Sequence, residues 1–466
     1  MTTRKKLLTS TALTLFLATP TLAETISVTE ASEAAITDAL AAAAASESAT
    51  RIVLAFEGDV EISETLAYDG RSALALIGSG QTVSTANNVT LLAATQGADL
   101  HIAGLTLAGP GGWTVENRGD VNGPAGKGIF VDLRDDQTGT LSFVAEDVTV
   151  SGVASYGIHL SDCTLADDCG GGQTGDGDGS EAGISVTLRN VTIDDVGNGT
   201  FDGDGLRVDE RGAGAIAAMI TGSTVSKAGA DGIELDEGGA GDNTAMVIDT
   251  RLVENGAYCT PALFEDAIPD PDEAEFEQGE VTEADIPGPV TGTADDSCVE
   301  REVDLYDDGS VEAYEFGLDL DDGIDFDEGG AGSVQATFLR SVISRNLDEG
   351  VDFDEAGDGG IDVQFIDTVA EGNTDDGYKN SEEDAGSVTG LMLRSSATGN
   401  GGKGVVFEEE DGGDLVVHVY DSATSGNDDS DDTGIEAVQE DDGTGALTLV
   451  NSDIADGTDL EGVEVK

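Results

Sequence analysis

The chain has 466 residues, of which 95 are Asp or Glu and only 20 are Lys or Arg, so its formal net charge at pH 7 is −75. Proteins that bind nucleic acid neutralise its phosphates with Lys and Arg, and this composition excludes nucleic acid as a partner. A surface this acidic is typical of very soluble or salt-adapted proteins.

The segment 1–23 has the composition of a secretory signal peptide. Arg4, Lys5 and Lys6 precede an apolar run, and small residues lead to a cleavage site after Ala23. The predicted mature chain, 24–466, is secreted or periplasmic and keeps 17 bases against 95 acids, a charge of −78. No other stretch is long and apolar enough to span a bilayer, so we expect no integral membrane segment.

A segment that opens with glycine and continues with acidic residues recurs with a 27-residue period. Gly323 opens GIDFDE and Gly350 opens GVDFDE. A Ser or Thr follows every glycine of the series at one fixed distance, as Ser341 follows Gly323, and an Asn follows five of them at another. The glycines are Gly205, Gly232, Gly323, Gly350, Gly377, Gly404 and Gly434, and the asparagines are Asn255, Asn346, Asn373, Asn400 and Asn427. Such self-similarity predicts a solenoid.

Each repeat has the pattern strand, turn, strand, turn. Ile324 and Phe326 alternate with Asp325 and Asp327, as in a half-buried strand. Glycine-rich turns follow, and a second apolar alternation begins near Val334. A propeller blade needs about 40 to 50 residues, more than this 27-residue repeat provides. We therefore predict that each repeat forms one coil of a right-handed parallel β-helix. Stacked coils also explain the asparagines, since amides in register can form a hydrogen-bonded ladder.

These features resemble the right-handed parallel β-helix superfamily that includes pectate lyases and polygalacturonases. The resemblance covers nearly all of 24–466. It begins at the Ala-rich stretch Ile36–Ser46, followed by RIVLAFEGDVEISETL, and DLHIAGLTLAG from Asp99 is similar to an early coil. It implies a single all-β domain with an N-terminal capping helix.

Four cysteines lie where the repeat is interrupted. Cys163 and Cys169 fall in a loop near 161–182, and Cys259 and Cys298 fall in a longer insertion. Four cysteines allow three connectivities. We predict the disulfides Cys163–Cys169 and Cys259–Cys298, which in an oxidising compartment would staple the loops rather than bind zinc or perform redox chemistry.

The longer insertion, near 257–320, separates Gly232 from Gly323 by far more than one repeat. It holds five of the eight prolines and many acids. Long insertions on a regular scaffold are often functional, and some are disordered. We interpret this one as a flap, with disorder as the alternative.

Stacked coils place equivalent carboxylates one above another. Two carboxylates about 5 Å apart repel by about 1 kcal/mol even in water, and few bases are present to offset this. Ca²⁺ takes about six to eight oxygens, so we predict a calcium cofactor shared between coils, with ionic screening and raised carboxyl pKa values as alternatives. The predicted ligands are Asp209, Glu210, Asp236, Glu237, Asp325, Asp327, Glu328, Asp352, Asp354, Glu355, Glu408 and Glu409.

The resemblance also implies a search for catalysis, because pectate lyases combine acidic calcium ligands with a basic proton acceptor. Arg207 and Lys379 stand in the outward column two positions after the repeat glycine and are the catalytic candidates. As the alternative, each is a charge partner for neighbouring acids. The histidines His101, His159 and His418 lie in separate repeats and show no ligand spacing.

The sequence therefore predicts a secreted acidic scaffold that binds divalent cations and polysaccharide. A polysaccharide lyase or glycoside hydrolase acting on a face of the β-helix is the first alternative. A passive, salt-adapted surface or adhesin component is the second.

Overall fold

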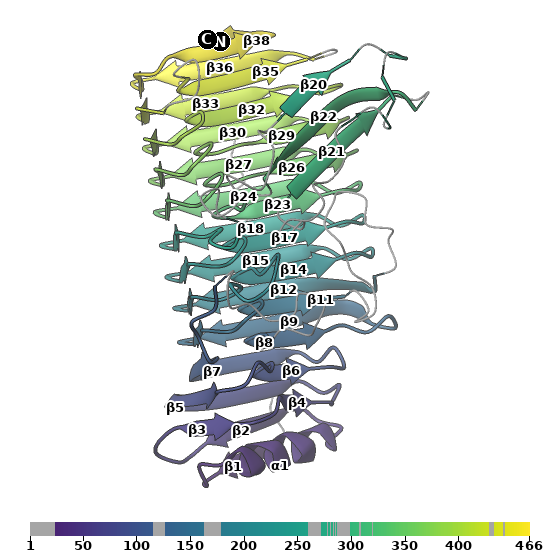
Figure 1. Ribbon diagram of the computed structural model, residues 1–466, viewed down its shortest axis with the longest axis vertical. Helices are drawn as coiled ribbons and strands as arrows, with labels where there is room; N and C mark the ends of the chain where they lie inside the picture. Colours follow the sequence, from purple (N-terminus) through teal and green to yellow (C-terminus); the bar gives the residue numbers. More distant parts are fainter. Residues whose placement is uncertain are drawn as a thin grey trace, which may run out of the picture.

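The computed structural model describes residues 24–466 apart from 115–125, 163–178, 260–271, 277, 280, 283, 285, 287–298, 307–308, 319, 428–432 and 441–442. Almost all of its regular structure is β-strand, and the strands stack as successive rungs along the long axis (Figure 1). The predicted signal peptide and Cys163, Cys169 and Cys298 lie outside the described residues.

Two large parallel sheets form the rungs. Sheet B has 12 strands in the described chain, namely β4 (Leu66–Tyr68), β6 (Leu92–Ala94), β8 (Ile129–Asp132), β11 (Ile158–Ser161), β14 (Leu206–Glu210), β17 (Ile233–Glu237), β23 (Asp325–Glu328), β26 (Asp354–Gly357), β29 (Ser381–Asp384), β32 (Val405–Glu409), β35 (Ile435–Gln439) and β38 (Thr458–Glu461).

Sheet A has 24 strands in the described chain, two for most coils. They are β1 (Glu24–Val28), β2 (Thr50–Leu54), β3 (Val60–Ile62), β5 (Leu74–Thr85), β7 (Leu100–Ala108), β9 (Thr138–Glu146), β10 (Thr149–Ser151), β12 (Glu181–Arg189), β13 (Thr192–Asp194), β15 (Ile216–Thr221), β16 (Thr224–Ser226), β18 (Asn243–Ile248), β19 (Arg251–Val253), β24 (Val334–Leu339), β25 (Val342–Ser344), β27 (Ile361–Ile366), β28 (Val369–Glu371), β30 (Val388–Leu393), β31 (Ser396–Thr398), β33 (Val416–Tyr420), β34 (Ala423–Ser425), β36 (Gly445–Val450), β37 (Asp453–Ile454) and β39 (Val463–Val465).

The register of sheet B follows the sequence repeat. Asp327 pairs with Asp354, Asp354 with Ser381, and Ser381 with Glu408, so each partner lies one repeat further along the chain. Because each partner is parallel and belongs to the next repeat, the chain winds as a parallel β-helix, as predicted.

The interior of the coil is apolar, and a column of hydrogen-bonded asparagine amides joins successive coils. Phe326 and Phe353 are fully buried, and their rings stack with centroids 4.5 Å apart. The predicted asparagine ladder is present, because each Nδ2 donates to the Oδ1 of the asparagine in the next coil. The distances are 3.0 Å for Asn255 to Asn346, 3.0 Å for Asn346 to Asn373, 3.1 Å for Asn373 to Asn400 and 2.9 Å for Asn400 to Asn427.

The N-terminal end of the coil is closed by a helix, as predicted. Helix α1 (Glu33–Ala44) buries Ile36 and Leu40 against the first strands. Its N-cap is Ser32, whose Oγ accepts a hydrogen bond from the Ala35 backbone N–H at 3.3 Å. No helix in the described part of the chain is both long and apolar enough to cross a bilayer.

The insertion near 257–320 contains regular structure, which the sequence analysis did not predict. Strands β20 (Asp272–Glu275), β21 (Val299–Leu305) and β22 (Val311–Leu318) form a small antiparallel sheet. Val311 and Tyr314 pack together in its own small apolar cluster. Figure 1 draws it in green beside the stacked rungs. Its role as a flap stays a prediction.

Cys259 is buried, but both predicted disulfides need cysteines outside the described residues and remain predictions.

Candidate functional site

The two acidic columns predicted from the repeat lie on opposite sides of sheet B. Successive residues of a strand point to opposite faces. In β23 the side chain of Glu328 is on the same side as the buried Phe326, toward the interior, whereas Asp325 and Asp327 point outward. The predicted calcium ligands therefore do not form one surface but an inward column of glutamates and an outward column of mostly aspartates.

The inward column, here called the glutamate column, caps the glycine-rich turns of its first three coils. Glu328 Oε1 accepts hydrogen bonds from the backbone N–H groups of Gly330 at 3.3 Å and Gly332 at 3.1 Å, and Glu210 and Glu237 do the same in their own coils. All members are at most 1% exposed: Glu210, Glu237, Glu328, Glu355, Glu382 and Glu409. Gln439 continues the column beyond Glu409 in the next coil.

Protons rather than bases relieve the repulsion inside the glutamate column. Burial, then hydrogen bonds with Glu210 and Glu328, raise the pKa of Glu237 to about 10. Burial and a hydrogen bond with Glu328 likewise raise the pKa of Glu355 to about 9. Glu237 and Glu355 thus carry a proton at neutral pH, which is the raised-pKa alternative of the sequence analysis.

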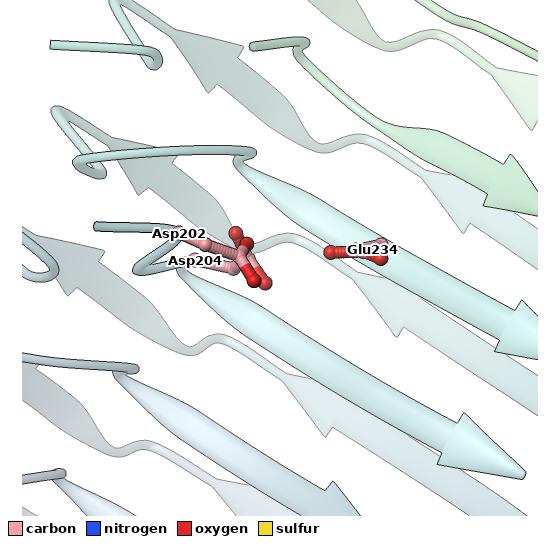
Figure 2. Close-up of side chains that lie close together, drawn as sticks. All are labelled: Asp202, Asp204 and Glu234. Atoms are coloured by element: carbon pink, nitrogen blue, oxygen red, sulfur yellow. The ribbon is translucent and has the colours of Figure 1, made fainter. Parts of the chain in front are cut away.

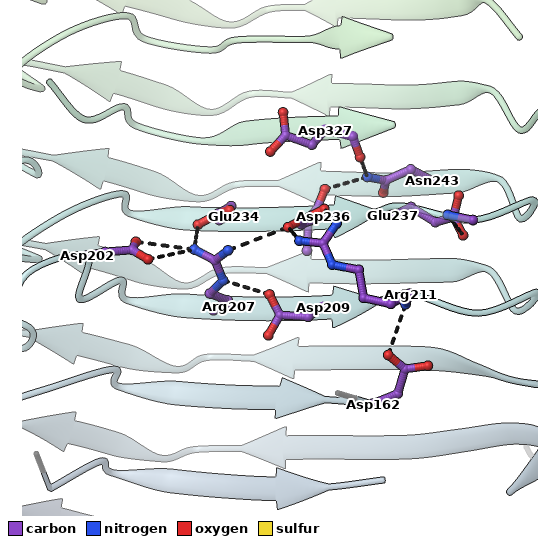
Figure 3. Close-up of polar contacts among 12 residues, drawn as sticks. Asp162, Asp202, Arg207, Asp209, Arg211, Glu234, Asp236, Glu237, Asn243 and Asp327 are labelled. Carbon is purple, nitrogen blue, oxygen red and sulfur yellow. Dashed lines mark hydrogen bonds and ion pairs between the residues drawn. The ribbon is translucent and has the colours of Figure 1, made fainter. Parts of the chain in front are cut away.

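The outward face near β14 and β17 is organised by Arg207 (Figure 3). Its Nε donates to Asp209 Oδ1 at 2.7 Å, and its Nη1 donates to Asp202 at 3.2 Å and also to Glu234. Burial alone would lower the pKa of Arg207, but Glu234 and the other carboxylates hold it well above its usual value. The guanidinium, whose side chain is only 6% exposed, keeps its proton and acts as a charge partner.

Two groups of three carboxylates on this face have oxygens within 4.8 Å of one another, namely Asp202, Asp204 and Glu234, and Glu234, Asp236 and Asp327. Figure 2 shows the first group converging beside the sheet B strands. Arg207 contacts all three members of the first, and both Arg207 and Arg211 bind Asp236 in the second. Both groups thus already contain guanidinium ion pairs, and calcium binding at them stays a prediction.

Lys379 also has the surroundings of a charge partner. Its Nζ lies 2.9 Å from Asp352 Oδ2 and 3.9 Å from Asp354 Oδ1. The charge of Asp352 raises the pKa of Lys379 well above its usual value, so the ammonium is kept. Of the other predicted ligands, Asp325 and Glu408 also point outward, and burial raises the pKa of both carboxyls.

A third basic site, which the sequence analysis missed, joins three successive coils. We call Lys127, Tyr156, His159 and Asp209 the lysine–histidine cluster. His159 Nε2 lies 2.6 Å from Asp209 Oδ2, and Lys127 Nζ contacts His159 Nδ1. The ring centroids of Tyr156 and His159 are 4.4 Å apart, and Lys127 Nζ lies 4.6 Å from the Tyr156 ring centroid. His159 and Asp209 are buried, whereas Lys127 and Tyr156 remain partly exposed.

The protonation states in this cluster differ from those of free side chains. Burial lowers the pKa of Lys127 to about 8. Burial, then the charge of Lys127, lowers the pKa of His159 to about 4. Burial and the nearby carboxylates raise the pKa of Tyr156 well above its usual value. Near neutral pH the cluster therefore offers an amine ready to lose its proton, a neutral imidazole and a protonated phenol.

A signal for this cluster was present in the sequence. Gly128 and Gly157 open β8 and β11 and continue the glycine series toward the N-terminus. Gly157 follows Gly128, and Gly205 follows Gly157, at longer intervals than those of the regular repeat, so the 27-residue period did not find them. With those coils in register, His159 falls beside Arg207 in the same outward column.

No protein-family model and no curated protein matches the chain. Solved structures with similarity include ORF18 of Geobacillus virus E2, with 8% identity and a TM-score of 0.40, covering 82% of this chain and 57% of that one. The A-module of the mannuronan C-5 epimerase AlgE4 from Azotobacter vinelandii is 14% identical, with a TM-score of 0.39 and coverage of 93% and 92%.

A third similar structure is the catalytic unit of a GH87 α-1,3-glucanase from Streptomyces thermodiastaticus. It is 14% identical, with a TM-score of 0.41, and the match covers 94% of this chain and 69% of that chain. The chain thus spans just over half the length of the viral protein and most of the length of the two enzymes.

Proposed function

We propose that the protein is a polysaccharide-cleaving enzyme whose acid–base chemistry resides in the lysine–histidine cluster. The observation that carries this proposal is the contact of Lys127, an amine with a pKa of about 8, with a buried His159–Asp209 pair on the outward face of sheet B. An amine of near-neutral pKa can accept a proton at physiological pH, which an exposed lysine does poorly.

In this proposal each member of the cluster has a role. Asp209 accepts from His159 Nε2–H, which leaves Nδ1 as an acceptor facing Lys127. The imidazole thereby orients the lysine amine, and the amine can take a proton from a bound substrate. Tyr156, held protonated, lies beside them and can return a proton to a leaving oxygen.

These roles fit eliminative cleavage of a glycan that contains uronate residues. Lys127 would remove the proton from the carbon next to the sugar carboxylate. The glycosidic C–O bond would break as a C=C bond forms, and Tyr156 would protonate the departing oxygen. Hydrolysis needs two available carboxyl groups. Asp209 is poorly suited to that, because its oxygens are engaged by Arg207 and His159.

The proposal is tested by incubating the mature protein with a panel of polysaccharides. Elimination yields unsaturated sugars that absorb in the ultraviolet, whereas hydrolysis yields new reducing ends without that absorbance. Lys127→Met should abolish cleavage. Lys227→Met is the matched control, because Lys227 is an exposed lysine whose Nζ lies 3.8 Å from Asp194. Equal turnover by wild type and Lys127→Met would refute the assignment.

A second candidate is a secreted or periplasmic scaffold that binds divalent cations, favoured by the clustered carboxylate oxygens on the outward face. Its test is the melting temperature of the mature protein in millimolar calcium compared with sodium chloride of equal ionic strength. A rise specific to calcium supports it. Equal effects would favour screening and a passive, salt-adapted surface role.

A further inference from the structure

A third group of carboxylates lies away from the arginines, in the turns that lead into β23 and β26. Asp322 directly precedes the repeat glycine Gly323, and Asp348 and Glu349 precede Gly350 in the next coil. One oxygen of each of the three carboxylates lies within 4.8 Å of the others. Asp322 is 7% and Glu349 is 9% exposed.

In neighbouring coils, the carboxylate before the repeat glycine has a fixed hydrogen-bond partner. Asp204 Oδ1 accepts from the backbone N–H of Asp231 at 3.1 Å, and Asp231 Oδ1 accepts from that of Asp322. Asp376 Oδ1 accepts from the backbone N–H of Lys403 in the same way. Each carboxylate thus caps the equivalent residue of the next coil.

The pattern breaks at Asp322. Its Oδ1 is buried and has no hydrogen-bond partner in the described chain. An anionic oxygen taken out of water without a partner costs several kcal/mol, on the order of the penalty for other buried charges. Asp352 Oδ1, two positions after Gly350, is in the same state, although its Oδ2 binds Lys379 at 2.9 Å.

No base compensates this group. Among the described residues, no Lys or Arg forms an ion pair with Asp322, Asp348 or Glu349, whereas Arg207 and Arg211 form ion pairs within the two groups nearer the N-terminus. Lys379 is the nearby base, and its ion pairs go to Asp352 and Asp354. A cation from outside the chain would give Asp322 Oδ1 the partner that it lacks.

We propose that Asp322, Asp348 and Glu349 bind a divalent cation of the calcium type. All the donors are oxygens, which suit hard cations, and three carboxylates leave room for water and backbone carbonyls in a shell of about six to eight. None of the three positions belongs to the acidic columns predicted from the repeat. The site deepens the second proposed function and rests on it.

The test is calcium titration by calorimetry of the mature protein after removal of bound metal by chelation. Asp322→Asn should weaken calcium binding at one site at least tenfold, and Glu349→Gln should do the same. Asp376→Asn is the matched control, because Asp376 holds the equivalent position in the coil after that of Glu349 and already has an amide partner. The control should bind like wild type.

The outcomes separate this site from the wider proposal. If wild type binds calcium and both Asp322→Asn and Glu349→Gln bind it with unchanged number and affinity, only the assignment to this group is refuted. If wild type binds no calcium, the proposed function as a cation-binding scaffold is refuted as well. Removing one charge should also raise the melting temperature in chelator, which shows that the variants fold.

Discussion

Glu237 and Glu328 occupy the same register position on the neighbouring strands β17 and β23, although the insertion near 257–320 separates them in the chain. Both are fully buried, and each caps its own glycine-rich turn. A hydrogen bond between the two side chains contributes to the raised pKa of Glu237. This pair shows how the fold tolerates stacked acids: it keeps protons that the unfolded chain would release.

That retention makes stability depend on pH. The folded-state pKa values of Glu237, about 10, and Glu355, about 9, are raised above the unfolded value. Their stabilisation is fully present below the unfolded pKa and is lost as pH rises toward the folded pKa. We expect the free energy of unfolding to fall between about pH 5 and pH 9, by at most about 1.4 kcal/mol per pH unit for each retained proton. Urea denaturation at several pH values measures this. A flat profile would contradict it.

Replacing a protonated glutamate by its neutral isostere should remove part of that dependence. Glu237→Gln keeps an oxygen for the turn amides and supplies a permanent donor, as Gln439 does at the end of the column. We expect a melting temperature several degrees above wild type at pH 9 and little change at pH 5. Glu371→Gln on an exposed strand end is the control and should behave like wild type at both.

The proposed general base predicts a pH profile for catalysis. Because Lys127 must lose its proton and its pKa is lowered to about 8, kcat/KM should rise tenfold per pH unit below that value and level off above it. His159→Gln should lower kcat/KM and move the midpoint of this rise, since it changes the group that contacts the amine. A profile that falls over the same range would assign the base elsewhere.

Arg207 should be among the most sensitive positions for stability. Arg207→Met leaves several buried carboxylates, among them Asp209 and Glu234, without their cation. Removing one partner of a buried ion pair lowers the free energy of unfolding by about 3 to 5 kcal/mol, which chemical denaturation can measure. Arg345→Met, which removes a 2.9 Å ion pair with Glu254 from an arginine side chain that is 54% exposed, should cost under about 1 kcal/mol. Similar losses for both would refute the central role of Arg207.

Two adjacent glycines test the stacking of the turns. A Cβ at Gly413 would lie 1.4 Å from the carbonyl oxygen of Gly386 in the preceding coil, whereas a Cβ at Gly412 would meet nothing within 4 Å. We expect Gly413→Ala to lower the melting temperature by many degrees and Gly412→Ala to leave it nearly unchanged, as judged by thermal unfolding. Equal effects would mean that the coils do not stack this closely.

Much of the fold could be predicted because side-chain identity repeats with the coil. The asparagines occupy a common position, so one spacing predicted the whole ladder, and the alternation around Phe326 predicted which residues are buried. The same alternation also implies that Glu328, two positions after Phe326, points inward. Because Glu328 is acidic, however, the sequence analysis predicted that it is a ligand on the surface. Burial of carboxyls is rare enough that composition argues against it.

The lysine–histidine cluster could be predicted less well because it depends on contacts between coils of unequal length. His159 and Asp209 are 50 residues apart and meet only after the loop near 161–182 is excluded from the count. Arg207 illustrates the same limit: its role as a charge partner was foreseen as an alternative, but Asp202 lies outside the acidic segments of the repeat, and only the fold brings it to Arg207.

The asparagine ladder also gives the solenoid an electrical direction. Every amide from Asn255 to Asn427 donates toward the C-terminal end, so the side-chain dipoles add rather than cancel. The positive end of this row meets a carboxylate, because Asn427 Nδ2 donates to Asp456 Oδ2 at 2.9 Å. An anion at the positive end of aligned peptide dipoles is the arrangement that stabilises helix N-termini. Here a row of side chains along the axis reproduces that effect without a helix.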